Sequence, residues 1–231
     1  MLIHAIFTLL RGGTVDFTSV MMNVLAVLFV MFAILPLHEY AHAWMANKLG
    51  DTTALQAGRH TINPLASFEP LGALFLLLFG FGWAKPVPVD PRRFKNPRRD
   101  MALTALAGPV SNILAALVGA ILYLALAVFA FQYNVPTWLY YFFFYYITVN
   151  ASLAVFNLLP LPPLDGSKVV GAFLSGRAMY QYYRYQNQIM MVVFLLIFSG
   201  ALDVPLSYLQ SALTNGIFYL AELPFRLFGV L

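Results

Sequence analysis

The chain has 231 residues, of which 61% are hydrophobic and only 10% are charged. Soluble domains carry about 25% charged residues, so this composition excludes a soluble globular protein and indicates an integral membrane protein. The absence of cysteine also excludes disulfide bonds and thiolate metal ligands. Any metal must therefore be held by histidine, aspartate, glutamate or similar groups.

Residues 2–10 are apolar but too short to cross a bilayer as a helix. They lack the basic start and the cleavage site of a signal peptide, so we predict a helix in the membrane interface or packed on the bundle. The first long span is predicted over residues 20–47, with Lys48 and Gly50 as helix-ending signals. Pro36 lies inside this span and is expected to kink the helix or loosen its hydrogen bonding.

Three ionisable residues follow that proline inside the apolar span: His38, Glu39 and His42. Histidines at i and i+4 share one helix face and can bind the same metal ion. Glu39 stands beside that face as the candidate general base for a water acidified by the metal. Ionisable groups inside a span are costly and mark functional sites. The alternative is a buried histidine pair satisfied by backbone carbonyls, with Glu39 at a helix interface.

A polar segment, residues 51–67, comes next and contains His60. His60 is an alternative metal ligand, but a histidine in a surface loop is the favoured interpretation. Within residues 68–83, the stretch 71–83 is apolar and rich in glycine (Gly72, Gly80 and Gly82), and its roughly thirteen residues are too few for a helical crossing. Because basic residues flank the segment on both sides, we predict a re-entrant or hairpin-like element, with a true span as the alternative.

Residues 84–100 are rich in proline and basic residues. The basic cluster could bind nucleic acid. Its place between apolar segments instead favours a cytoplasmic loop, because the positive-inside rule places basic residues on the cytoplasmic side. We therefore expect no nucleic-acid partner. The cluster comprises Arg92, Arg93, Lys95, Arg98 and Arg99.

Further spans are predicted over residues 101–131, 138–159 and 189–209, with a short polar turn at 132–137. Aromatic residues after that turn indicate the far membrane interface. The tail, residues 210–231, reads as an amphipathic interfacial helix. The predicted fold is thus an all-α polytopic membrane protein with about four long transmembrane helices, a short re-entrant segment and interfacial terminal helices. We expect a single membrane-embedded domain over residues 1–231.

A catalytic zinc usually takes three protein ligands, so one more is needed beside the two histidines. Asp165 is the carboxylate after Asp100 that the positive-inside topology places near the cytoplasmic half of the membrane. It follows a proline-rich break, which lets an aspartate point into a cavity. Its alternative role is to cap the helix that begins at Gly166. The residues alone leave these two roles open.

The chain resembles the site-2 protease family, whose hallmark motifs are HExxH, GPxxN and NxxPxPxLDG. All three are matched in the family's order and without departure, within residues 20–170. Residues 82–89 also resemble the compact bacterial and archaeal branch, and no PDZ or CBS domain is expected. The matching stretches are His38-Glu39-Tyr40-Ala41-His42, Gly108-Pro109-Val110-Ser111-Asn112 and Asn157-Leu-Leu-Pro-Leu-Pro-Pro-Leu-Asp165-Gly166.

The resemblance implies an intramembrane metalloprotease with one catalytic Zn²⁺. Its ligands match His38, His42 and Asp165, and its general base matches Glu39. The matches to Asn112 and Asn157 imply that these residues position the substrate backbone or steady the tetrahedral intermediate. The expected partners are the lipid bilayer and a transmembrane protein or peptide substrate. The expected location is a prokaryotic cell membrane, with the active site towards the cytoplasm.

Two other functional classes compete with this hypothesis. The first is a non-catalytic relative that binds substrates or partners, but a binding protein has no need of Glu39 between two ligands. The second is a protein that conducts cations along His38, Glu39, His42 and Asp165. Transporters of that class commonly contain internal repeats, and the sequence has none.

Overall fold

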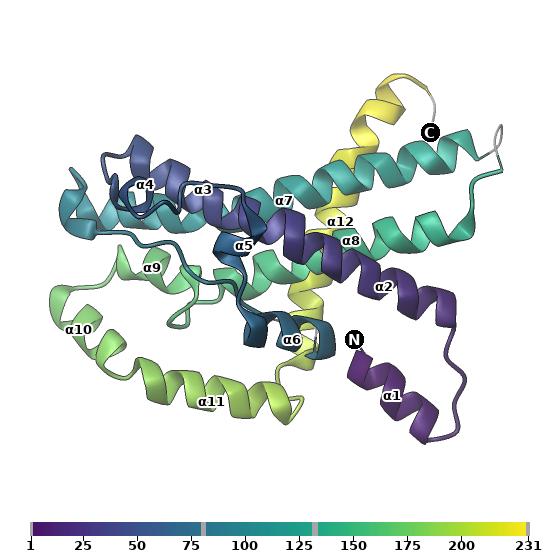
Figure 1. Cartoon of the computed structure of the whole chain (residues 1–231), viewed down its shortest axis with the longest axis horizontal. Helices are drawn as coiled ribbons and strands as arrows, with labels where there is room; N and C mark the ends of the chain where they lie inside the picture. Colours follow the sequence, from purple (N-terminus) through teal and green to yellow (C-terminus); the bar gives the residue numbers. More distant parts are fainter. Residues whose placement is uncertain (1, 80–81, 131–133, 230–231) are drawn as a thin grey trace.

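A computed structural model describes residues 2–79, 82–130 and 134–229. Every regular element in these ranges is helical, which confirms the predicted all-α class. The helices over residues 17–48, 97–129 and 137–158 lie along one direction, and the helix over residues 203–227 crosses them (Figure 1). The shorter helices lie at one end and along one side of this bundle. The expected helix end at Phe131, the turn residue Gln132 and the glycine at position 80 lie outside the described residues.

The first long helix is continuous from Phe17 to Lys48 and has three parts. They are α2 (Phe17–Phe29), a π-helical turn η1 (Val30–Ile34) and α3 (Leu35–Lys48). In the π turn the backbone N–H of Leu35 donates to the carbonyl of Val30, five residues back. Pro36 follows directly and lacks the N–H that a regular helix would need there. The expected loosening of hydrogen bonding around Pro36 is therefore confirmed.

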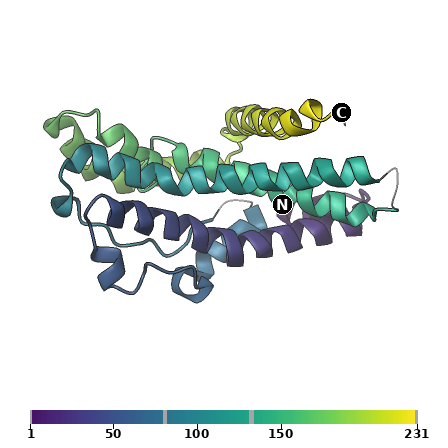
Figure 2. The same ribbon diagram turned by 90° about the horizontal axis from the view of Figure 1, so that it is seen from above.

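Two further long helices, α7 (Pro97–Phe129) and α8 (Thr137–Leu158), run antiparallel and pack against each other and against the first one (Figure 2). Small buried residues let their backbones approach closely, as in other membrane bundles. Among them are Ala116 and Ala120 of α7 and Ala151 of α8. Among the described residues, these three helices are long and apolar enough to cross a membrane. The prediction of a polytopic membrane protein is confirmed.

The predicted fourth span, residues 189–209, does not form one helix. Helix α11 (Gln186–Phe198) ends within this range, and α12 (Asp203–Leu227) begins after a turn. Gly200 adopts a positive φ of 76°, and the N–H of Ala201 bonds the carbonyl of Leu196, which is how glycine commonly terminates a helix. Helix α12 packs across α7 and α8 and buries Ile217. The tail is thus a long helix packed on the bundle.

The segment between α3 and α7 leaves one end of the bundle and returns to the same end (Figure 1). It contains α4 (Thr53–Gln56), α5 (Pro64–Ser67), α6 (Pro70–Phe79) and the 3₁₀ turn η2 (Pro91–Arg93). An added Cβ at Gly72 would lie 1.9 Å from the carbonyl oxygen of Trp83, so the two backbones touch where only glycine fits. This path agrees with the predicted hairpin.

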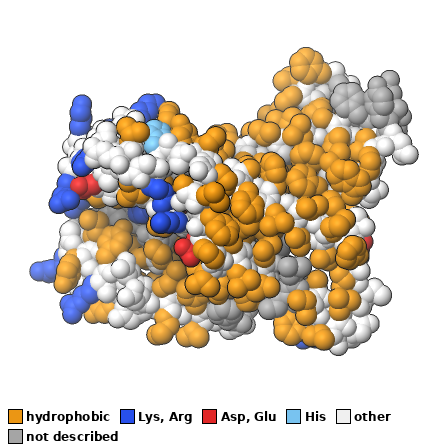
Figure 3. Space-filling view, viewed as in Figure 1, with side chains coloured by type: hydrophobic (Ala, Val, Ile, Leu, Met, Phe, Trp, Pro, Cys, Tyr) orange, Lys and Arg blue, Asp and Glu red, His pale blue; other side chains and the backbone are white. Residues whose placement is uncertain are grey.

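Hydrophobic and basic side chains cover different parts of the surface. Hydrophobic side chains cover much of the bundle in the space-filling view, whereas Lys and Arg gather at the end where α4 and α10 (Gly176–Arg184) lie (Figure 3). Membrane proteins concentrate basic residues on the cytoplasmic side. The basic end is also where α3 ends and α7 begins, so it marks the end of the bundle nearest the histidines of α3.

Candidate metal centre and active site

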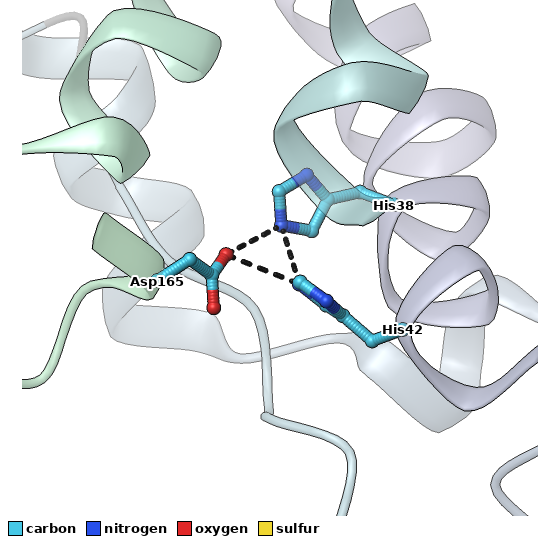
Figure 4. Close-up of side chains that lie close together, drawn as sticks. All are labelled: His38, His42 and Asp165. Atoms are coloured by element: carbon cyan, nitrogen blue, oxygen red, sulfur yellow. Dashed lines mark hydrogen bonds and ion pairs between the residues drawn. The ribbon is translucent and has the colours of Figure 1, made fainter. Parts of the chain in front are cut away.

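His38, His42 and Asp165 converge on one point (Figure 4). The two histidines lie one turn apart on α3, and Asp165 opens the short helix α9 (Asp165–Gly171). The two Nε2 atoms are 3.1 Å apart, and Oδ2 of Asp165 lies 3.4 Å from Nε2 of His38 and 3.1 Å from that of His42. All three residues are buried. The structure thus brings together the three ligands expected from the sequence.

Each imidazole is oriented by a partner on its other nitrogen. Nδ1 of His38 lies 2.5 Å from Oδ1 of Asn112, and Nδ1 of His42 lies 2.7 Å from the carbonyl oxygen of Thr104. A carbonyl only accepts, so each Nδ1 carries the proton and donates it. Both Nε2 lone pairs then face Asp165. This is the usual arrangement of histidine ligands, whose outer nitrogen donates to a protein oxygen.

The donor set fits a zinc ion. Tetrahedral zinc with metal-to-donor distances of about 2.0–2.1 Å separates its donors by about 3.3–3.4 Å, close to the three separations at this site. A Cβ at Gly108 would lie 2.3 Å from Nε2 of His42 and 2.5 Å from Nε2 of His38, so glycine keeps the space beside the donors open. Two nitrogen donors and one carboxylate, without sulfur, are a common zinc set.

Asp165 is held in place by the break before α9. An added Cβ at Gly166 would lie 2.2 Å from the carbonyl oxygen of Leu158, so α9 packs tightly on the end of α8. The cap residue of α9 is Leu164, and Asp165 makes no recorded hydrogen bond to a backbone N–H. Its carboxylate contacts the two histidines and Lys168 instead. Of the two roles left open by the sequence, the geometry supports the ligand.

Glu39 lines a cavity of about 520 Å³ together with the three candidate ligands. Its Oε2 accepts a hydrogen bond of 2.9 Å from the backbone N–H of Val87. Val87 belongs to an irregular segment, residues 84–90, that forms one wall. The other lining residues include Trp83, Met101, Thr104, Phe156, Asn157, Pro163, Met190 and Phe194. The cavity is large enough for an extended peptide segment, and the walls are mostly apolar.

Segment 84–90 is fixed at both ends. The N–H of Lys85 donates to the carbonyl of Ser67, and the N–H of Asp90 donates to the buried carboxylate of Asp51. Hydrogen bonds from the side chain and the backbone N–H of Arg92 lower the pKa of Asp90, which keeps its carboxylate ionised at neutral pH. The wall that contacts Glu39 is thus tied to the loop after α3 and to the turn before α7.

The other predicted site residues lie in different surroundings. Asn157 lines the cavity, and its Nδ2 donates to the carbonyl of Leu153. Asn112 is fully buried, and both ends of its amide are engaged, by His38 and by Asn150. His60 lies outside the three-residue group, with its ring centroid 4.9 Å from that of Tyr40.

Sequence reasoning missed Val87, Asn150 and Lys168. The contacts of Val87 and Thr104 are made by backbone atoms, which carry no sequence signature. Asn150 had one signal, a polar residue within an apolar span. Lys168 also had a signal, because it stands three residues after Asp165 at helical spacing.

Comparisons with known proteins agree with this geometry. Residues 131–199, which include Asp165, match the model of Peptidase family M50. The relatives include three proteins named "Putative zinc metalloprotease". YwhC of Bacillus subtilis (strain 168) is 44% identical over 136 residues, 58% of this chain and 62% of the relative. MJ0611 of Methanocaldococcus jannaschii is 32% identical over 133 residues, with the same two shares.

The third relative is Rip2 of Mycolicibacterium smegmatis, 33% identical over 136 residues, 56% of this chain and 50% of the relative. The chain therefore spans about 62% of the length of the first two relatives and half of the third. No solved structure matches. The resemblance inferred from the three motifs thus agrees with what the chain is similar to: a model of Peptidase family M50 over residues 131–199 and relatives named "Putative zinc metalloprotease".

Proposed function

We propose that the protein is an intramembrane zinc metalloprotease that hydrolyses peptide bonds within or near transmembrane segments of membrane proteins. The convergence of His38, His42 and Asp165 within hydrogen-bonding distances carries this proposal. Two further observations support it. Glu39 shares the cavity of the three donors, and the relatives that match are named "Putative zinc metalloprotease".

One Zn²⁺ would be held by Nε2 of His38, Nε2 of His42 and Oδ2 of Asp165. When bound, zinc supplies a Lewis acid that polarises a peptide carbonyl and lowers the pKa of water. Glu39 acts as general base and then as general acid: its carboxylate takes a proton from the attacking water and delivers it to the leaving nitrogen. The hydrogen bond from Val87 engages Oε2, which leaves Oε1 to carry that proton.

Two asparagines serve this chemistry in different ways. Asn157 lines the cavity and holds the substrate backbone through its amide. Asn112 has no surface in the cavity and acts through His38, whose proton it fixes on Nδ1. The sequence resemblance implied a substrate-contacting role for both residues. Burial of Asn112 supports the indirect role instead.

The proposed substrates are membrane-spanning helices. Such a helix hides its carbonyls in internal hydrogen bonds, so it must unwind locally before any carbonyl reaches the zinc site. Segment 84–90 offers irregular backbone beside the cavity, and an extended substrate strand pairs with such an edge. Small or helix-breaking residues near the scissile bond favour this unwinding.

We further propose one membrane-embedded domain over residues 1–231 in a prokaryotic cell membrane, with the active site towards the cytoplasm. The basic residues at the end of the bundle where α3 terminates support this orientation. His42 lies six residues before Lys48, about 9 Å along a helix, so the metal centre would sit just inside the membrane on that side.

The test is cleavage of a synthetic transmembrane peptide by the purified protein in liposomes. Treatment with a zinc chelator should abolish cleavage, and added Zn²⁺ should restore it. Metal analysis should find about one zinc per chain, lost in Asp165→Ala but retained in Asp203→Ala, an aspartate at the start of α12. A purified protein that binds no zinc, or that cleaves equally well after chelation, would contradict the proposal.

A further inference from the structure

Asp165 uses its two carboxylate oxygens differently. Oδ2 faces the two histidines, whereas Oδ1 points away from both imidazoles (Figure 4). Oδ1 is 3.0 Å from Nζ of Lys168, the residue three positions further along α9. This spacing places both side chains on the same face of the helix. Among the described residues, Lys168 is the one recorded partner of Oδ1.

An aspartate needs such a partner to hold one orientation. The torsion that turns the carboxylate plane is broad, so the carboxylate of an unsupported aspartate samples many orientations. A cation on Oδ1 removes that freedom and directs Oδ2 towards the histidines. His38 and His42 have their own supports, in Asn112 and in the carbonyl of Thr104. With Lys168, every proposed zinc ligand has a partner that fixes its donor.

Lys168 lies in the wall between two cavities. It lines the 520 Å³ cavity of the candidate active site and a second cavity of about 370 Å³, which Ser167 and Gly171 of α9 also line. Met101 and Pro163 complete this shared wall. The Lys168 side chain is 36% exposed, so its ammonium group keeps contact with solvent while it binds Asp165. The ion pair therefore avoids the full desolvation cost of a buried pair.

We propose that Lys168 is a positioning residue that holds Asp165 in its ligand orientation and thereby strengthens metal binding. The inference rests on the proposed zinc site. This role differs from two others that are open to a lysine at this position. A lysine that contacts substrate would alter KM, and a lysine that only stabilises α9 would alter unfolding but not the affinity for zinc.

The experiment measures the zinc affinity of the purified protein by competition with a chelator of known affinity, without substrate. Lys168→Met should bind zinc about 10- to 100-fold more weakly, the usual effect of removing a partner of a metal ligand. Lys168→Arg keeps the cation and should recover most of the affinity. Arg98→Met is the matched control, because Arg98 lines the second cavity but has no recorded contact with Asp165.

Kinetics on a transmembrane peptide give a second reading. At limiting zinc, kcat of Lys168→Met should fall, and it should recover at saturating zinc with KM unchanged. Should Lys168→Met fold poorly, Lys168→Gln provides the same reading in a polar side chain. Zinc affinity within twofold of wild type in a folded variant would overturn the inference and leave the proposed function intact. A wild-type protein without zinc would overturn both.

Discussion

Oδ1 of Asn112 lies 2.5 Å from Nδ1 of His38, and Nδ2 of the same amide lies 3.2 Å from Oδ1 of Asn150. Asn150 in turn donates to the carbonyl of Tyr146, one turn earlier on α8. Both asparagines are fully buried. Asn150 therefore fixes which atom of the Asn112 amide faces His38, and through it the nitrogen of His38 that carries the proton.

Removal of the Asn150 side chain should weaken zinc binding, although Asn150 acts on His38 only through Asn112. In Asn150→Ala the Asn112 amide loses the acceptor for its Nδ2 and is free to turn. We expect zinc affinity to fall about 10-fold or more, as for other partners of metal ligands. Thr148→Ala is the control, because Thr148 lies on the same helix and its hydroxyl bonds only the local carbonyl of Phe144. Unchanged zinc affinity in folded Asn150→Ala would remove Asn150 from the site.

The contact between Val87 and Glu39 predicts an effect on catalysis without an effect on metal. Val87→Pro removes the N–H that holds Oε2 of Glu39. A hydrogen bond to a charged group contributes about 1.5–3 kcal/mol, so kcat should fall about tenfold or more. Zinc content should not change, because the N–H of Val87 bonds Glu39 and none of the three proposed ligands.

Val89→Pro is the matched control for this variant. Val89 lies in the same segment and lines the same cavity, but its N–H has no recorded bond to Glu39. Steady-state kinetics on one transmembrane peptide compare the two. Equal losses in both variants would show that the segment matters for its shape alone, and that the hydrogen bond from Val87 does not orient the base.

Much of the site follows from local spacing in the sequence. His38 and His42 are one helical turn apart, so their common face could be predicted from sequence alone. Two roles for Asp165, metal ligand and helix cap, stayed open until the family motif was considered. Asn150 had a signal as a polar residue within an apolar span, but its contact with Asn112, like that of Val87 with Glu39, joins segments that are distant along the chain and could not be predicted. No short-range rule specifies which helices pack together.

Two breaks in the helices have a local cause in the sequence, but only one of them was expected. The π turn before Pro36 has a local cause, the missing proline N–H, and loosened hydrogen bonding at this point was expected. The break at Gly200 also has a local cause, a glycine that ends α11 with a positive φ. The apolar residues on either side of that glycine led to the prediction of one continuous span. Hydropathy averages over a window and therefore overlooks a single helix-terminating residue.

The hairpin between α3 and α7 predicts a specific pattern of accessibility. Single cysteines at Ala57 and Asn96 should both react with an impermeant thiol reagent from the cytoplasmic side, because the chain returns to the end it left. A cysteine at Asn134, beyond the far end of α7, should react only from the other side. The wild-type chain has no cysteine, so each label reports one position. Labelling of Ala57 and Asn96 from opposite sides would mean that residues 68–83 cross the membrane.

Replacement of Glu39 by glutamine tests the central claim most directly. The substitution keeps the size of the side chain but removes the base, while His38, His42 and Asp165 remain. The measurement is zinc content and cleavage of a transmembrane peptide by purified wild-type and Glu39→Gln protein in the same liposomes. The account predicts about one zinc per chain and intact substrate binding in both, with cleavage by the variant lower by about 10²–10⁴-fold. Cleavage by Glu39→Gln at a rate near that of the wild type would contradict it.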